Sequence, residues 1–275
     1  MQPRFELVLR PRKGWQPLDF QEVYLQRELL GFLMWRDIKI RYRQTLLGGV
    51  WAVLQPLMAM FVFTFFFHRL AGVKGDPQVP YPVFAFAGLS VWTFFANALS
   101  QSSNSLLANQ QMVKKVYFPR IFIPLGTIGA MLLDLLLSLV LLAFLMLYYR
   151  IHLTAHVLLL PLFIVGALLS AAGLGMMLSA LNVSFRDVKY VVPFLIQMGI
   201  FVTPVIYPIR VIPQKWILLM GLNPMAGMVI GFRYSLLGSA ASWGVMGISL
   251  AVSALTFVVG LYVFRRMERH FADVI

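Results

Sequence analysis

The sequence contains no cysteine and little charge. The absence of Cys among 275 residues excludes disulfides, thiolate metal ligands and cysteine nucleophiles. Only 12% of the residues are charged, whereas 60% are hydrophobic and the mean hydropathy is +0.81. Soluble globular domains carry about 25% charged residues, so this composition predicts an integral membrane protein.

Acidic residues are scarcer than basic ones, with 10 Asp and Glu against 23 Lys and Arg and a net charge of +13. In a soluble protein such an excess would indicate nucleic-acid binding. Here the basic residues flank apolar stretches, where they meet anionic lipid headgroups. We therefore expect membrane lipid, and no nucleic acid, as a partner.

The sequence also lacks a phosphate-binding loop for nucleotides, since no Gly-Lys dipeptide occurs in it. Asp134 is the sole carboxylate within the apolar stretches, and either a functional role or a structural hydrogen bond between helices would account for it. His152 and His156 are four residues apart and share a face if that segment is helical, but a zinc site needs a third ligand. We expect no catalytic residue, metal or cofactor on this chain.

Six long stretches with almost no charge predict an all-α integral membrane protein. A helix needs about 20 apolar residues to cross the hydrocarbon core, and open sheets cannot satisfy their backbone there. The predicted spans are residues 46–68, 82–101, 121–148, 156–181, 190–207 and 243–264. They form a transmembrane domain (46–264) between a cytoplasmic segment (1–45) and a cytoplasmic tail (265–275).

The distribution of basic residues predicts the orientation. The segments before the first span, after the sixth, and between spans two and three and spans four and five hold 17 of the 23 Lys and Arg. The positive-inside rule therefore places both termini in the cytoplasm. The first 18 residues contain no signal-peptide core, so insertion is expected to start from the first span.

The segment before the first span predicts an amphipathic interface helix. Asp19 and Glu22 have capping-box spacing, and Phe20, Val23, Leu30, Leu33 and Met34 follow at helical spacing. A helix on the inner leaflet explains this pattern, and a solvated lead-in segment is the alternative. Four basic residues come next: Arg36, Lys39, Arg41 and Arg43. Headgroup anchoring explains them, and a sharper hypothesis is that they also receive an anionic substrate headgroup.

A polar stretch, residues 97–111, follows the second predicted span and is rich in Ser, Asn and Gln without any charge. Such side chains suit protein or water contact better than lipid. Residues 114–120 then form what we call the elbow, a short cytoplasmic turn whose proline disfavours helix at the preceding residue. The elbow presents cations and rings: Lys114, Lys115, Tyr117, Phe118, Pro119 and Arg120.

Residues 207–238, which we call the hairpin, are apolar but interrupted by three prolines and a glycine. Neither half is long enough to span a membrane. Asn223 and Pro224 form a plausible N-cap and first-turn pair. We therefore predict two short helices that dip into the outer leaflet as a re-entrant hairpin.

Several of these stretches together resemble the membrane subunits of type 2 ATP-binding cassette exporters for lipid-linked polysaccharides, which include O-antigen, capsular polysaccharide and teichoic acid. The elbow carries the first resemblance. The others are Arg36-Asp37 with Arg41-Tyr42, Leu47-Gly48, Trp51 with Gln55-Pro56, Phe185-Arg186-Asp187, and Thr203 to Pro208 followed by Asn223-Pro224. They cover nearly the whole chain in the family's order.

The resemblance implies a bacterial inner-membrane homodimer of six-span subunits, paired with two copies of a separate ATPase subunit that binds ATP and Mg. The elbow would be the segment that docks onto the ATPase, and Arg186 and Asp187 would make a smaller contact. Simple positive-inside anchoring is the alternative for the elbow. The alternatives for the whole chain are a type 2 permease for a lipid or drug and, from another class, an intramembrane enzyme of glycan assembly.

Two helix faces combine rings and amides and are our candidates for the substrate path. Aromatic rings stack on sugar faces and amides bond hydroxyls, although a packed or lipid-facing aromatic stripe is the plainer interpretation. In the first span the face comprises Trp51, Gln55, Met58 and Phe65, and in and after the fifth it comprises Phe194, Gln197, Phe201, Pro204 and Tyr207.

Overall fold

The computed structural model describes residues 24–43, 50–70, 72, 75–77, 79–185 and 187–271. All regular secondary structure in this part of the chain is helical, which confirms the predicted all-α class. The proposed capping box of Asp19 and Glu22, the Leu47-Gly48 pair and Arg186 lie outside the described residues.

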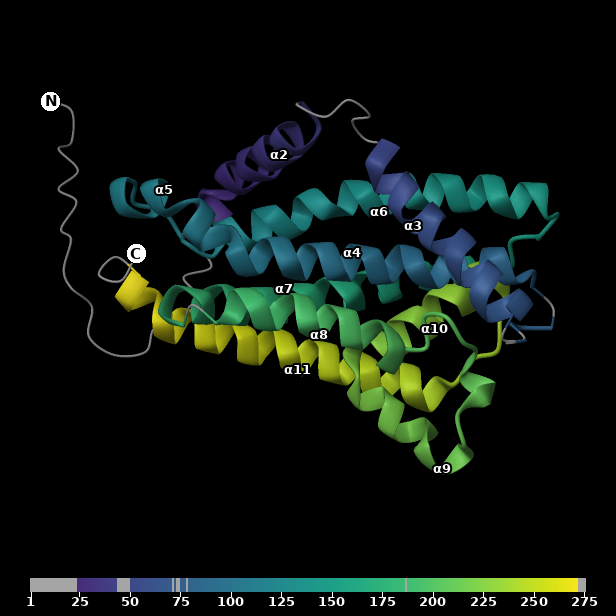
Figure 1. Ribbon diagram of the computed structural model, residues 1–275. Helices are drawn as coiled ribbons and strands as arrows, with labels where there is room; N and C mark the ends of the chain where they lie inside the picture. The colour runs from purple at the N-terminus through teal and green to yellow at the C-terminus, as the bar shows by residue number, and fades with distance from the viewer. Residues whose placement is uncertain are drawn as a thin grey trace, which may run out of the picture.

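Four long helices run side by side along the length of the molecule (Figure 1). They are α4 (Tyr81–Ala108), α6 (Phe122–Tyr148), α7 (Leu160–Ser184) and α11 (Trp243–Met267). The most apolar part of α4 is 78% buried, against 28% for α11. Because α4 also packs against α3, α8 and α10, it is the central helix of the bundle.

The other two predicted spans, the first and the fifth, are less regular helices. Helix α3 (Val50–Phe63) continues as a π-helical stretch (Thr64–Leu70) and packs against α4 and α6. Together with the four long helices it makes five helices long and apolar enough to span a membrane, all at predicted positions. The fifth predicted span is the shorter helix α8 (Val188–Val202), which ends before residue 207 because Pro204 disfavours helical backbone at Thr203.

The hairpin bends sharply and returns into the bundle. Its first arm contains η3 (Ile209–Val211), α9 (Gln214–Ile217) and η4 (Leu218–Leu222), and its second arm is α10 (Pro224–Leu237). The two arms meet at 108°. The Asn223 side chain accepts a hydrogen bond of 3.0 Å from the Met225 N–H, which confirms the predicted N-cap.

Small residues let α7 and α11 approach closely. A Cβ atom on Gly260 would overlap the backbone of Gly173, and the Ser170 hydroxyl donates to Ser253 at 2.8 Å. Close backbone contact of this kind replaces the hydrophobic effect as the force that holds helices together in lipid. The α7–α11 contact therefore packs these two helices closely side by side.

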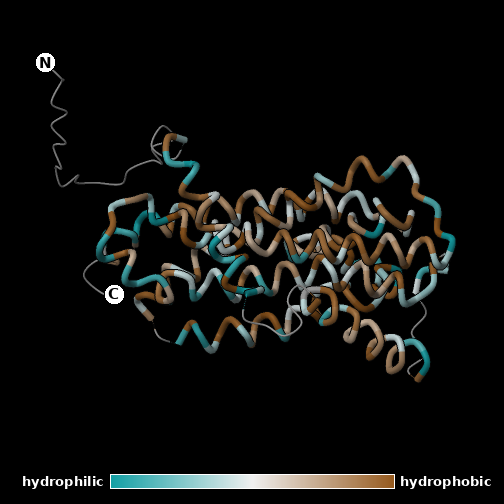
Figure 2. The backbone as a smooth tube through the Cα atoms, turned by 90° about the horizontal axis from the view of Figure 1, so that it is seen from above, coloured by the Kyte–Doolittle hydropathy of each residue, from teal (hydrophilic) through white to brown (hydrophobic). Residues whose placement is uncertain are grey.

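Hydrophobic residues dominate the middle of the bundle, and hydrophilic residues gather mainly at its two ends (Figure 2). One end, the elbow end, carries α5 (Gln110–Lys115), the last turns of α11 and α2 (Arg27–Arg43), which packs against α6. The opposite end, the hairpin end, carries α9 and the bend of the hairpin (Figure 1). This polarity is what a membrane-spanning bundle requires.

Candidate functional site

The elbow projects some of its residues outward and fixes the others to the chain itself. Lys114, Lys115 and Tyr117 are exposed, with Tyr117 at 76%, whereas Phe118 is only 6% exposed. The Arg120 guanidinium donates a 2.6 Å hydrogen bond to the carbonyl of Glu268, just beyond α11. The elbow is thus held against the end of α11 while it presents two cations and one ring.

The loop between α7 and α8 lies at the same end. Phe185 and Asp187 are exposed there. Of the predicted smaller contact only Asp187 can be placed, because Arg186 lies outside the described residues.

The polar stretch after the second predicted span is the last part of α4 and packs against α7. Ser103 and Ser105 are buried, and the Asn182 amide donates to the Ser103 carbonyl at 2.9 Å. The Ser105 and Ser179 hydroxyls are 3.4 Å apart. The serines of this stretch therefore face protein, whereas Gln101 and Asn104 are exposed, and we expected protein or water contact from their type.

Helix α2 is seated on α6 by both packing and polar contacts. Leu33 is buried, and Gly126 of α6 leaves the space that Leu33 occupies. The Thr127 hydroxyl donates to Asp37 at 3.0 Å, and Asp37 also pairs with Arg36 at 2.8 Å. These contacts place α2 across the first half of α6.

Asp134, further along α6, adds a second polar contact between α2 and α6. Its carboxylate pairs with Arg41 at 2.8 Å and accepts a hydrogen bond from the Tyr42 hydroxyl. Burial and the Asp134 carboxylate together raise the pKa of Tyr42 above its usual value, so this hydroxyl stays protonated. The lone carboxylate in the spans thus has a structural partner, as one of our two interpretations required.

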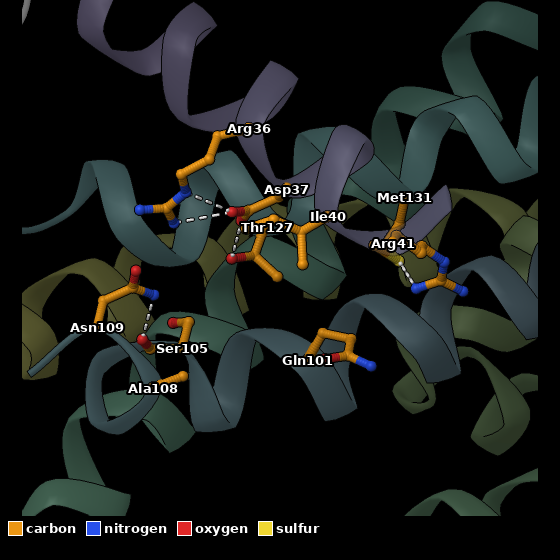
Figure 3. Close-up of a pocket in the computed structure, with 10 residues that line it drawn as sticks. All are labelled: Arg36, Asp37, Ile40, Arg41, Gln101, Ser105, Ala108, Asn109, Thr127 and Met131. Atoms are coloured by element: carbon orange, nitrogen blue, oxygen red, sulfur yellow. Dashed lines mark hydrogen bonds and ion pairs between the residues drawn. The ribbon is translucent and has the colours of Figure 1, made fainter. Parts of the chain in front are cut away.

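A cavity of about 420 Å³ opens beside this contact, between α2, α4 and α6 (Figure 3). Arg36 and Arg41 line it together with the amides of Gln101 and Asn109, but each arginine already pairs with a carboxylate. A second hollow, of about 250 Å³, is lined by Arg36, Lys39, Ile40 and Arg43. Of the four basic residues of the predicted headgroup site, Arg41 pairs with Asp134 of α6 and Arg36 pairs with its neighbour Asp37. Lys39 and Arg43 are exposed and line the second hollow together with Arg36.

Both predicted ring-and-amide faces lie on the surface of the single chain. Trp51, Gln55, Met58 and Phe65 are all exposed, as are Phe194, Gln197 and Phe201. Pro204 is buried, and Tyr207 is half-buried with its hydroxyl donating to the Phe201 carbonyl at 3.0 Å. Helices α3 and α8 both pack against α4, so the two faces flank the central helix.

Comparison with known proteins now gives the family. The profile described as ABC-2 type transporter matches residues 28–237, which run from α2 to the end of α10. The chain belongs to the ABC-2 type transporter family. This ABC-2 chain is a transmembrane transporter subunit.

The ABC-2 chain is similar to curated proteins over most of its length. The O-antigen export system permease protein RfbA of Klebsiella pneumoniae is 30% identical over 90% of this chain and 95% of its own length. RfbA of Myxococcus xanthus is 32% identical over 78% and 82%, respectively. The polysialic acid transport protein KpsM of Escherichia coli is 26% identical over 89% and 95%.

The two histidines of the ABC-2 chain do not meet the condition for a shared helix face. His152 lies outside any helix and His156 in the 3-10 helix η2 (Ala155–Leu159), so they share no helix face. The His156 ring instead packs 4.4 Å from that of Tyr234, between ring centroids. The Thr154 hydroxyl, 3.0 Å from His156 Nδ1, completes a structural contact.

Sequence reasoning missed Arg233, which the structure buries at the hairpin end of the ABC-2 chain. Its side chain is 3% exposed and bonds backbone carbonyls of two other elements. The sequence did offer one signal, a single cation within an otherwise apolar segment. An ionisable residue at such a position usually pairs with a polar group of the protein or has a functional role.

Proposed function

We propose that this ABC-2 chain forms the channel of an ATP-driven exporter that moves lipid-linked, O-antigen-like polysaccharide across the bacterial inner membrane. The observation that carries the proposal is the end-to-end similarity to O-antigen export permeases, which reaches 95% of the relative's length. The similarity to a polysialic acid transport protein supports a polymer as the substrate class.

The proposed assembly contains two copies of this chain and two copies of an ATPase subunit that binds ATP and Mg. The exposed apolar faces of α3 and α8 support a second copy as a partner, because rings such as Trp51 and Phe194 are more than half exposed in one chain. Two copies would enclose a path between these faces. Rings and amides at intervals along that path would offer a polymer many weak contacts, so a long chain can keep moving.

The elbow is our proposed docking segment for the ATPase. Lys114, Lys115 and Tyr117 carry the contact in this proposal, because they are exposed. Phe118, Pro119 and Arg120 hold the elbow to the rest of the chain, with Phe118 buried and Arg120 bonded to Glu268. Motion of the ATPase would therefore reach α6 and α11 through a fixed joint. Arg186 and Asp187 remain the proposed smaller contact.

This proposal puts the elbow end, and both termini, in the cytoplasm, in agreement with the distribution of basic residues. The open surface of Arg36, Lys39 and Arg43 then lies where a lipid-linked substrate arrives from the inner leaflet. Arg36, Lys39 and Arg43 line this hollow at helical spacing, and although Asp37 pairs with Arg36, the remaining positive charge suits an anionic phosphate headgroup. Arg41 supports them by holding α2 to α6.

Native mass spectrometry of the complex tests the proposal. Tagged protein would be purified in gentle detergent from its own membrane, with and without Lys115→Glu combined with Tyr117→Ala. We expect a complex of two permease and two ATPase chains that the double variant weakens by about tenfold or more, as loss of a central ring and a cation does at interfaces. The paired control is Lys215→Glu combined with Trp216→Ala, an exposed cation and ring at the hairpin end.

The control should leave the complex intact. Recovery of the unmodified chain without any ATPase under several gentle conditions would contradict the proposed exporter. An unweakened complex in the elbow variant would contradict only the elbow's role.

A further inference from the structure

The segment that joins α8 to the hairpin, residues 203–206, is a non-helical turn within an apolar bundle. Three successive carbonyl groups in this turn, those of Pro204, Val205 and Ile206, therefore need partners outside their own helix. All three find side-chain donors from other helices. The Arg233 guanidinium donates to Pro204 at 2.6 Å and also to Val205, and the Tyr81 hydroxyl donates to Ile206 at 2.9 Å.

Arg233 also reaches the central helix. Its Nε donates to the Phe84 carbonyl at 2.9 Å, and its guanidinium carbon lies 3.6 Å from the centre of the Phe84 ring. One side chain of α10 thus bonds both α4 and the end of α8. The planar fork of arginine donors makes this possible, whereas the ammonium of a lysine is a compact point charge.

The central helix is shaped to receive this arginine. Tyr81, Phe84 and Gly88 occupy one face of α4, at spacings of three and four residues. A Cβ atom on Gly88 would lie 2.8 Å from the Val205 carbonyl oxygen and would overlap the Arg233 guanidinium. The remaining cavity, lined by Arg233, Phe84 and Asp76 among others, is about 20 Å³, hardly more than one water molecule.

We infer that Arg233 is a positioning residue that fixes the turn 203–206, and with it the end of α8, to the central helix. The hydrogen bonds of this buried cation go to backbone carbonyl groups, so three carbonyl dipoles and a ring stabilise its charge. Release of the turn would leave the Pro204 and Val205 carbonyl groups without this donor and would take two acceptors away from the buried guanidinium. The turn and the hairpin are therefore held in one position unless α4, α8 and α10 move together.

The consequence for transport rests on the proposed function, in which α8 lines the channel. The turn then lies at the hairpin end of α8, where α8 lines the channel. Arg233 makes the position of the turn depend on the central helix. Release of the turn can be measured without ATPase or polysaccharide. If the variant does not release the turn, the exporter proposal still stands. If the exporter proposal is wrong, Arg233 can still anchor the turn.

Cysteine labelling measures the release of the turn directly, because the chain has no native Cys. Val205 is fully buried, and its side chain is not the hydrogen-bond acceptor, so Val205→Cys reports exposure of the turn. The purified protein would be held in nanodiscs and treated with a membrane-impermeant maleimide, with and without Arg233→Lys. We expect Arg233→Lys to speed labelling by about 100-fold, since several hydrogen bonds from a charged donor are lost and each is equivalent to roughly tenfold in an equilibrium constant.

Two controls separate release of the turn from general loosening. Arg210→Lys changes an exposed arginine of the same hairpin and should leave the labelling of Cys at residue 205 unchanged. Leu142→Cys, buried in α6, should stay protected in the Arg233→Lys background. Unchanged labelling at residue 205 in folded Arg233→Lys protein would overturn the inference. Equal acceleration in Arg210→Lys or at residue 142 would overturn it as well.

A milder variant keeps the test decisive if Arg233→Lys does not fold. Tyr81→Phe removes the hydrogen bond to Ile206 but keeps the ring that stacks on His68, with centroids 5.0 Å apart. Labelling at residue 205 should then rise by about tenfold, the equivalent of one buried hydrogen bond. No rise in this variant would count against the inference.

Discussion

The two ends of the molecule use arginine in different ways. At the elbow end, Arg36 and Arg41 are partly exposed and pair with the carboxylates of Asp37 and Asp134. At the hairpin end, Arg233 is buried and bonds three backbone carbonyls. In the first arrangement the Arg41–Asp134 pair joins α2 to α6, and Lys39 and Arg43 are exposed beside it. The second arrangement fixes a non-helical turn inside the bundle. The elbow end is thus suited to contact with a partner, and the hairpin end is suited to holding the turn in place.

The close α7–α11 contact, which lies between the two ends, should give the largest effect. Gly260→Ala places a Cβ atom on the Gly173 backbone and should cost about 3 kcal/mol or more, because neither backbone can yield. Gly247→Ala in the same helix is the matched control, since a Cβ atom there meets open space. Thermal unfolding in one detergent, followed by size-exclusion chromatography, measures the difference. Equal melting temperatures for the two variants would contradict this description of the contact.

Within the elbow, adjacent rings should have opposite consequences. Phe118→Ala should destabilise the fold by about 3 kcal/mol, because a buried ring leaves a cavity. Tyr117→Ala should change stability by less than about 0.5 kcal/mol, because that ring is exposed. Thermal unfolding separates the two variants, and ATPase recovery should fall for Tyr117→Ala at unchanged melting temperature. Comparable melting temperatures for both would contradict the orientation of the elbow.

The contact between α2 and α6 should be weaker than the buried ring. Asp134→Ala leaves Arg41 and Tyr42 without their shared acceptor and should cost about 2–3 kcal/mol, below the range for fully buried pairs because Arg41 is partly exposed. Asp187→Ala removes an exposed carboxylate at the same end and serves as the control. A melting temperature for Asp134→Ala equal to that of the control would show that the contacts of Asp134 do not stabilise the seating of α2 on α6.

Much of this architecture could be predicted from the sequence. Hydropathy located the third span at 121–148, and the helix runs Phe122–Tyr148. The N-cap at Asn223 followed from local chemistry, because its acceptor serves an N–H two residues away. Properties that depend on length, apolar composition or near neighbours can therefore be predicted from the chain's residues alone.

The rest depends on distant partners. Pro204 ends α8 locally, but the turn that follows is stabilised by Tyr81 and Arg233, which are far from it in sequence. The elbow backbone is extended at Val116, and successive side chains of an extended segment point to opposite sides. The sequence could not tell which of Tyr117 and Phe118 would point inward. Asp134 likewise found its partner 92 residues away in Tyr42.

Transport by the reconstituted complex tests the central claim most directly. The chain and its ATPase would be placed in liposomes with fluorescent lipid-linked polysaccharide in the leaflet that faces the ATPase, and an impermeant quencher would report the polymer on the far side. We predict transfer that needs both ATP and the elbow, and that stops with Lys115→Glu combined with Tyr117→Ala. Transfer of the polymer without ATP, or ATP hydrolysis without any transfer, would contradict the account.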